Sequence, residues 1–118
     1  MNPRKIRRQA QGDRSSLRLA IAWYSRDQWE TLKSVAADPD NLDDSYETWV
    51  RALQRTRRQL RAQGIEPERV EVKVHDLVEW CREAGRPVDG GARAEYAAEL
   101  LWRRDHPGEQ RRSAATEQ

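Results

Sequence analysis

The chain has 118 residues, of which 36% are apolar and 36% are charged, with a formal net charge of +2 and a single cysteine. This length holds one domain, and one cysteine excludes an internal disulfide and a cysteine-based zinc site. No apolar run approaches the roughly 20 residues that a membrane-spanning helix needs, and the run from Leu19 to Tyr24 is too short for a secretory signal, so the cytoplasm is the expected location.

The two ends of the chain lack a periodic apolar pattern. Residues 1–16 are basic, and their cationic side chains are Arg4, Lys5, Arg7, Arg8 and Arg14. This composition favours a disordered basic arm at the N-terminus, and residues 106–118 are typical of a disordered C-terminal tail. A single globular domain is therefore expected over residues 17–105.

The first part of this domain is predicted to hold one strand and two helices. Residues 17–24 alternate with a period of two, which predicts a strand with one strongly apolar face. Ser25 and Gln28 have the spacing of a capping box and indicate a helix start, and the segment around Pro39 indicates its end. A longer helix is predicted to start at the signal Asp43, Asp44 and Ser45. Five apolar side chains recur at helical spacing before Gly64: Tyr46, Trp49, Val50, Leu53 and Leu60.

The second part is predicted to hold another strand and two more helices. Pro67 indicates a turn, and valine alternates with polar side chains over residues 69–75, which predicts a strand. Asp76 has the position of a helix cap, and Gly85 the position of a helix stop. A turn over residues 86–91 is then expected to lead into a last helix over 92–104.

The predicted fold class is α/β, with a β-α-α-β-α-α order in one small domain. About 45 residues separate the two strands, a length that permits a parallel pair joined by a helical crossover. A two-stranded sheet is marginal on its own. We therefore expect about four helices to cover it, and strand pairing across a homodimer is the alternative.

Two groups of residues are similar to those of a small family of uncharacterised bacterial proteins. They are Trp80-Cys81-x-x-x-Gly85-x-Pro87-x-Asp89 followed by Ala92-Arg93-x-x-Tyr96, and Gln28-Trp29-x-x-Leu32 with Tyr46-x-x-Trp49. The resemblance spans residues 19–102 and leaves out both ends. It implies a compact bacterial domain, and it implies no activity, cofactor or catalytic residue.

The acidic segment that starts at Asp38 invites comparison with a calcium-binding loop. An EF-hand loop needs an oxygen ligand at position five, glycine at position six and glutamate at position twelve. This segment has Leu42, Asp43 and Trp49 at those positions. We therefore interpret its acids as a cap for the helix that follows and as complements to the dipole of that helix.

Other residues that often carry chemistry also lack partners at the necessary spacing. Cys81 lies on an apolar helical stripe beside Trp80, which favours packing in the core over a nucleophile. His75 and Asp76 are adjacent, but no third group converges on them, and no glycine-rich phosphate loop is present. We expect no catalytic, metal or cofactor residue, no cofactor, and no enzyme.

Arginine provides the one functional signal in the sequence. Arg51, Arg55 and Arg58 share one face of the long helix, and Arg57 and Arg61 extend it. Clustered cations of this kind bind nucleic acid by neutralising phosphates. The alternative is a solvated face in which Glu47 pairs with Arg51 at i, i+4, and the low net charge counts against a dedicated nucleic-acid binder.

A helix-turn-helix is a weaker hypothesis for residues 92–104. Its outward positions would combine Arg93 and Arg103 with Glu95 and Glu99, and acids are unfavourable in the major groove. Two functions remain. The first is a non-enzymatic bacterial interaction module that binds another protein or itself. The second is a nucleic-acid-associated accessory protein that uses Arg51, Arg55 and Arg58 and the basic ends.

Overall fold

A computed structural model describes residues 17–108 of the chain. Its elements in order are β1 (Arg18–Trp23), α2 (Arg26–Val35), the 3-10 turn η2 (Pro39–Asn41), α3 (Tyr46–Ala62), β2 (Glu66–Glu71), α4 (Val74–Ala84) and α5 (Gly90–Asp105). The predicted β-α-α-β-α-α order is confirmed, and so is the parallel two-stranded sheet with four α-helices. The basic arm, residues 1–16, and residues 109–118 of the expected tail lie outside the described residues.

The two strands pair in one register, with Arg18 opposite Glu66 and Trp23 opposite Glu71. The Glu66 amide donates to the Leu17 carbonyl at 2.9 Å, and the Val72 amide donates to the Trp23 carbonyl at 2.9 Å. Backbone groups alternate along a parallel ladder. The backbone N–H and C=O groups of the odd-numbered residues of β1 therefore point toward β2. Those of the even-numbered residues point toward the opposite edge of the strand.

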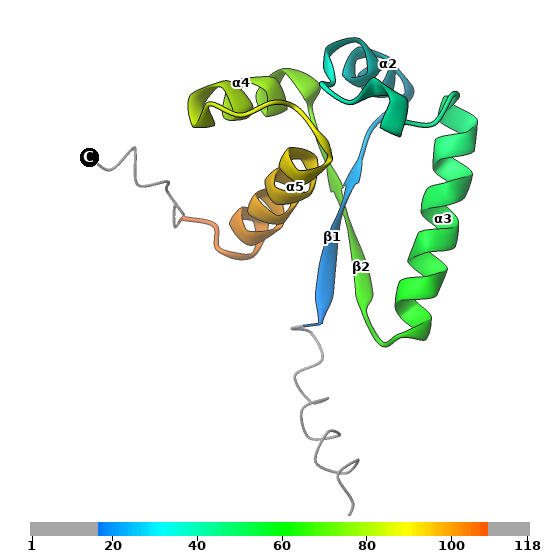
Figure 1. Cartoon of the computed structure of the whole chain (residues 1–118). Coiled ribbons are helices and arrows are strands. Elements are labelled where there is room, and N and C mark those ends of the chain that lie inside the picture. The colour runs from blue at the N-terminus through cyan, green and yellow to red at the C-terminus, as the bar shows by residue number, and fades with distance from the viewer. Residues whose placement is uncertain (1–16, 109–118) are drawn as a thin grey trace, which may run out of the picture.

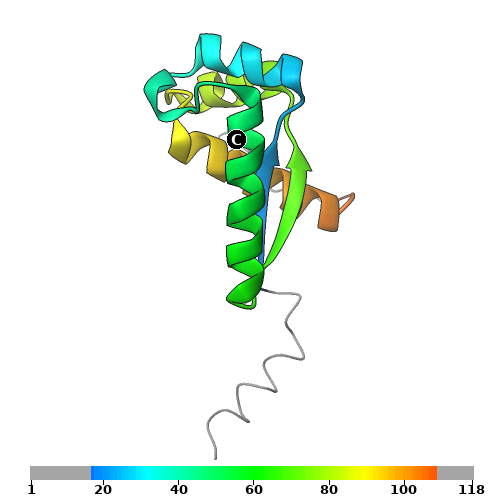
Figure 2. The same cartoon turned by 90° about the vertical axis from the view of Figure 1, so that its right-hand side faces the viewer.

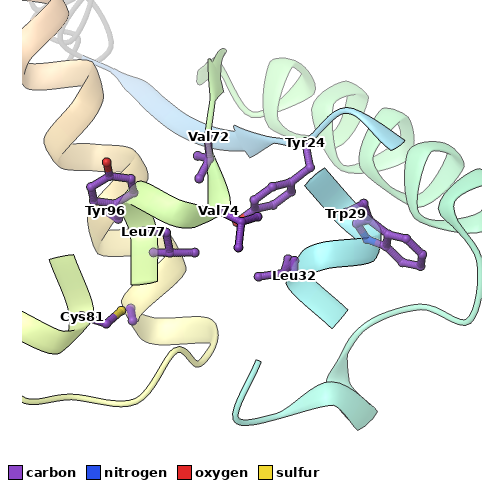
Figure 3. Packing of buried hydrophobic residues seen from close by; sticks show 9 residues of the cluster. Tyr24, Trp29, Leu32, Val72, Val74, Leu77, Cys81 and Tyr96 are labelled. Carbon is purple, nitrogen blue, oxygen red and sulfur yellow. The ribbon is translucent and has the colours of Figure 1, made fainter. Parts of the chain in front are cut away.

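The core lies at the carboxyl ends of the two strands, where α2, α4 and α5 meet (Figure 1). Figure 3 shows its side chains converging from α2, α4 and α5 and from the residues that directly follow the two strands, Tyr24 and Val72. The buried members of this cluster are Tyr24, Trp29, Leu32, Val72, Val74, Leu77, Cys81, Ala92 and Tyr96. Leu77 and Cys81 are buried because their spacing on α4 turns both toward α2 and α5.

The face of the sheet opposite α5 is covered by α3, which lies across the strands from α5 in both views (Figures 1 and 2). The side chains of Leu19, Ile21 and Trp23 alternate onto this face. Helix α3 is strongly amphipathic, yet none of its residues is buried. Its apolar stripe is therefore only partly covered by the described part of the chain.

The second strand begins earlier than predicted. Pro67 lies inside β2 instead of marking a turn before it. A proline is tolerated there because its missing N–H would point to the outer edge of the sheet, away from β1. The predicted strand over residues 69–75 was therefore wrong in its bounds, since Val74 already belongs to α4.

Two predicted helix starts also differ from the structure. Helix α4 begins at Val74, and the side chain of Gln28 caps it by accepting a hydrogen bond from the Val74 amide at 2.5 Å. Asp76 thus lies in the first turn of α4. The prediction that Asp76 caps this helix was wrong. Helix α5 begins at Gly90 and includes part of the predicted turn, because Asp89 caps it by accepting from the Ala92 amide at 2.9 Å.

Candidate protein-interaction groove

A groove of about 440 Å³ runs along the free edge of β1. Four consecutive strand residues, Leu19 to Ala22, line it, and these alternate between the two faces of the sheet. No residue of β2 is among its lining residues. The groove therefore follows the edge of β1 that faces away from β2, and we call it the β1 groove.

Helices on opposite faces of the sheet form the two walls of the β1 groove. Helix α3 supplies Trp49 and Leu53, and α5 supplies Arg93 and Ala94. The segment 41–43 and two core residues, Tyr24 and Leu32, complete the lining. Most of the lining is apolar, so the groove can exclude water from an apolar side chain.

The two outer edges of the sheet differ in their hydrogen bonding. On β2, Pro67 has no N–H to offer, and the Arg69 carbonyl accepts a hydrogen bond from Arg104 Nη2 at 3.0 Å. On β1, the outward groups belong to Ala20 and Ala22, and within residues 17–108 none of them has a hydrogen-bond partner. The β1 groove therefore exposes free backbone donors and acceptors.

Aromatic side chains position α3 beside the groove. The Trp49 ring lies 5.2 Å from the Trp23 ring and 5.7 Å from the Tyr24 ring, centroid to centroid. The Tyr46 hydroxyl donates to the Tyr24 carbonyl at 2.9 Å. These contacts hold the first turns of α3 at the end of β1. No similar anchor follows at Leu53, which leaves the middle of α3 as an open wall.

An ion pair positions α5 at the other wall. Arg93 donates to both carboxylate oxygens of Asp38, at 2.8 and 3.2 Å, and the Gly90 amide donates to Asp38 at 3.1 Å. The Arg93 guanidinium lowers the pKa of Asp38 to about 2. Asp38 therefore joins the loop before α3 to the start of α5, where Arg93 contributes to the groove without an unpaired charge.

These contacts correct two predictions about charged residues. Ser45, and no acid of the loop, caps α3 by accepting from the Thr48 amide at 3.1 Å. Arg93 is paired and half-buried, so it is no outward residue of a recognition helix. The helix-turn-helix hypothesis thus loses one of the two arginines that it placed at the DNA, and the other, Arg103, pairs with Glu99.

The predicted arginine face is exposed on α3. Arg51, Arg55 and Arg58 have no carboxylate partner among the described residues. Glu47 pairs with Arg26, and not with Arg51 as the alternative of a solvated face had it. Every other described arginine except Arg57 and Arg69 forms an ion pair; these are Arg18, Arg26, Arg61, Arg82, Arg86, Arg93, Arg103 and Arg104. The remaining predicted nucleic-acid contacts, Arg4, Lys5, Arg7 and Arg8, lie outside the described residues.

The other candidate residues show no convergent chemistry. Cys81 is buried in the core as predicted, and burial raises the pKa of its thiol. His75 and Asp76 are exposed at the start of α4. Within residues 17–108, no group of three or more histidine, cysteine, aspartate or glutamate side chains is placed to hold a metal ion.

Comparisons with known proteins add no relative. No family model matches the chain, and no curated protein or solved structure matches it. The resemblance of residues 19–102 to uncharacterised bacterial proteins therefore stays a prediction. In the described part of the chain, no helix is long and apolar enough to span a membrane.

The β1 groove was missed by reasoning from the sequence. A signal for it exists in the unequal chemistry of the two strands, since residues 19–24 carry no charge while residues 66–71 include a proline and four charged side chains. That contrast is typical of an open edge beside a protected one. Without the tertiary structure, however, either edge of β1 could have faced β2.

Proposed function

We propose that the protein is a non-enzymatic interaction module that binds a partner polypeptide in the β1 groove. The observation that carries this proposal is the free edge of β1, which lies at the base of an apolar groove between two helices. Strand edges and apolar grooves are recurrent sites of peptide recognition. The proposal assigns no catalytic residue.

The chemistry of the two edges supports a binding role for β1. Exposed strand edges are normally blunted by charge, proline or a covering segment, because an open edge recruits other chains. The β2 edge has all three kinds of protection, through Pro67, its charged side chains and the Arg104 contact. The β1 edge has no such residue between Leu19 and Trp23, which is expected of a strand that pairs with a partner.

Exposed apolar side chains support the same surface. Leu17 is 50% exposed and Leu19 is 46% exposed, and both alternate onto the α3 face. Leu19 lines the groove together with Ile21 and Leu53, and Leu17 precedes them on the same face of the strand. Contiguous apolar surface of this kind is typical of interaction sites.

A displayed library of short random peptides would test the proposal. We expect enriched peptides to bind the wild-type chain and to lose about tenfold or more in affinity with Leu19→Lys, because the cation enters an apolar groove. Val35→Lys is the matched control, since Val35 is similarly exposed at 41% but lies on α2 outside the groove. Failure to enrich any peptide, or equal losses in the two variants, would overturn the proposal.

A second candidate function is nucleic-acid association through α3. Its support is the concentration of carboxylate-free arginines at Arg51, Arg55 and Arg58, in a chain whose other exposed arginines are largely ion-paired. Neutralisation of phosphates by these side chains would give a salt-dependent affinity. The arginine face points away from the apolar stripe of α3, so the two candidate surfaces are separate.

Binding of duplex DNA and single-stranded RNA at several salt concentrations would test this candidate. We expect the triple change of Arg51, Arg55 and Arg58 to alanine to weaken binding. The slope of the logarithm of the binding constant against the logarithm of the salt concentration should become shallower by about 2–3. The control changes Arg82 and Arg103, which are exposed but paired with Glu79 and Glu99, to alanine. Binding that is absent at low salt, or equally affected in both variants, would exclude the candidate.

A further inference from the structure

We infer that the β1 groove takes a single extended segment of a partner protein, which becomes a third strand of the sheet. The segment is held by backbone hydrogen bonds to Ala20 and Ala22 and by large aliphatic side chains at alternate positions under α3. This inference rests on the proposed function and specifies the partner. Three features of the groove support this segment: its free backbone groups, its walls and the chemistry of its lining.

The backbone of β1 is prepared for another strand. Ala20 and Ala22 each direct an N–H and a C=O into the groove, in the alternation that a strand partner needs. Four lining residues of β1 correspond to about 13 Å of extended chain. A segment of about four residues therefore spans the groove and satisfies both alanines.

The walls leave space for one strand and not for a whole sheet. Trp49 and Leu53 of α3 and Arg93 and Ala94 of α5 line the groove from opposite sides of the sheet. Figures 1 and 2 show the same two helices on opposite sides of the strands. A second copy that offered its own β1 would bring its own α3 and α5 into these positions, so a lone segment fits better than a second domain.

The lining predicts which side chains the segment carries. Side chains that point toward α3 meet Leu19, Ile21, Trp49 and Leu53, which favours large aliphatic groups. The intervening side chains point toward the alanines of β1 and α5, and Arg93 beside them already has Asp38 as its partner. The preferred sequence therefore has two aliphatic residues separated by one small or polar residue.

The ends of this chain do not have that chemistry. The apolar side chains of residues 1–16 are Met1, Ile6 and Ala10, with the proline at position 3, and those of residues 109–118 are Ala114 and Ala115. Neither end contains two large aliphatic residues at alternate positions. Neither of these two stretches therefore matches the segment that the groove favours, which leaves a partner polypeptide as the proposed source of the strand.

A pair of synthetic peptides would test the inference. The first has valine at alternate positions with threonine between them, and the second has the same composition with its valines contiguous. We expect the alternating peptide to bind the full chain about tenfold more tightly. N-methylation at successive positions should weaken the binding of the alternating peptide at every second residue only, because only those N–H groups face Ala20 and Ala22.

The variant Ala22→Pro supplies a test from the protein side. It removes one outward N–H from β1, as Pro67 does on β2, and leaves the bonds between the strands intact. We expect the variant to bind the alternating peptide about tenfold more weakly, and its far-UV circular dichroism spectrum should match that of the wild-type protein. The N-methylation series needs no protein variant, so it decides the question even if Ala22→Pro does not fold.

Three outcomes would overturn the inference. Equal binding of the two peptides, or N-methylation effects without a period of two, would show that no strand is added. If Leu19→Lys still abolished the binding of library peptides, the proposed function would stand and only the strand geometry would fall. Light scattering that shows a dimer sensitive to Ala22→Pro would assign the edge to a second copy instead.

Discussion

The two faces of the sheet are built from similar residues but are packed differently. On the side of α5, Val72, Leu77 and Tyr96 are buried in the continuous core that α2, α4 and α5 form. On the α3 face, Leu19 and Leu53 line an open groove, and no residue of α3 is buried. The difference shows that an amphipathic helix can form and dock on a sheet while its apolar stripe stays only partly buried.

The same contrast continues along the edges of the sheet. The outer edge of β2 contains Pro67 and is contacted by Arg104, whereas the outer edge of β1 along the groove is uncharged and open. A domain that needed only its own sheet would gain stability and solubility from protecting both edges. The molecule thus has one edge that its own described residues protect and another that they leave open.

The largest expected difference is in the cost of truncating leucine on the two faces. Leu77→Ala removes a fully buried side chain and should lower the free energy of unfolding by about 2–5 kcal/mol. Leu53→Ala removes a half-buried side chain at the groove and should cost about 1 kcal/mol. Urea unfolding measures both, and equal costs would show that α3 is packed as tightly as α4.

A smaller effect is expected from the ion pair that positions α5. The pKa of Asp38 is about 2 in the folded chain against a normal value of 3.8. The folded state therefore binds fewer protons than the unfolded state in this range, and the stabilisation is complete above about pH 4 and is lost as the pH falls toward 2.

Asp38→Asn should remove this pH dependence and cost about 1–2 kcal/mol at neutral pH, because Arg93 loses its charged partner. Thermal unfolding followed from pH 2 to pH 7 measures both effects. Asp40→Asn is the control, since Asp40 is exposed in the same loop. The same acid dependence in wild type and Asp38→Asn would contradict the role of the pair.

The smallest effect is expected from a polar substitution at the open edge. Leu19→Thr should change the free energy of unfolding by no more than about 0.5 kcal/mol, because the side chain is exposed without a partner. Val70→Thr places the same hydroxyl in the α5 face, where residue 70 is buried, and should cost more than about 1 kcal/mol. A large loss at residue 19 would show that this edge is needed for folding instead of binding.

Much of the fold was predictable because its signals are local. Alternation over residues 17–24 defined β1. Ser25 capped α2 as its spacing predicted, by accepting from the Gln28 amide, and the apolar spacing and Gly64 predicted the extent of α3. Burial of Cys81 also followed from its position on an apolar stripe.

The errors concern side chains whose partners lie far away in the sequence. Gln28 was assigned to the cap of its own helix, but its side chain caps α4, 46 residues later. Asp38 was assigned to the helix that follows, but it pairs with Arg93, 55 residues later. Short-range spacing cannot distinguish such partners, because a polar side chain bonds whichever group the fold brings within reach.

The sequence by itself determined the order of the elements, their amphipathic faces and the unequal charge of the two strands. Only the tertiary structure decided that β1 turns Ala20 and Ala22 outward, and that α3 and α5 form the walls of a groove there. The physical reason is that periodicity determines which side chains share a face, whereas an open edge depends on which strands pair and on where helices distant in the chain pack against them.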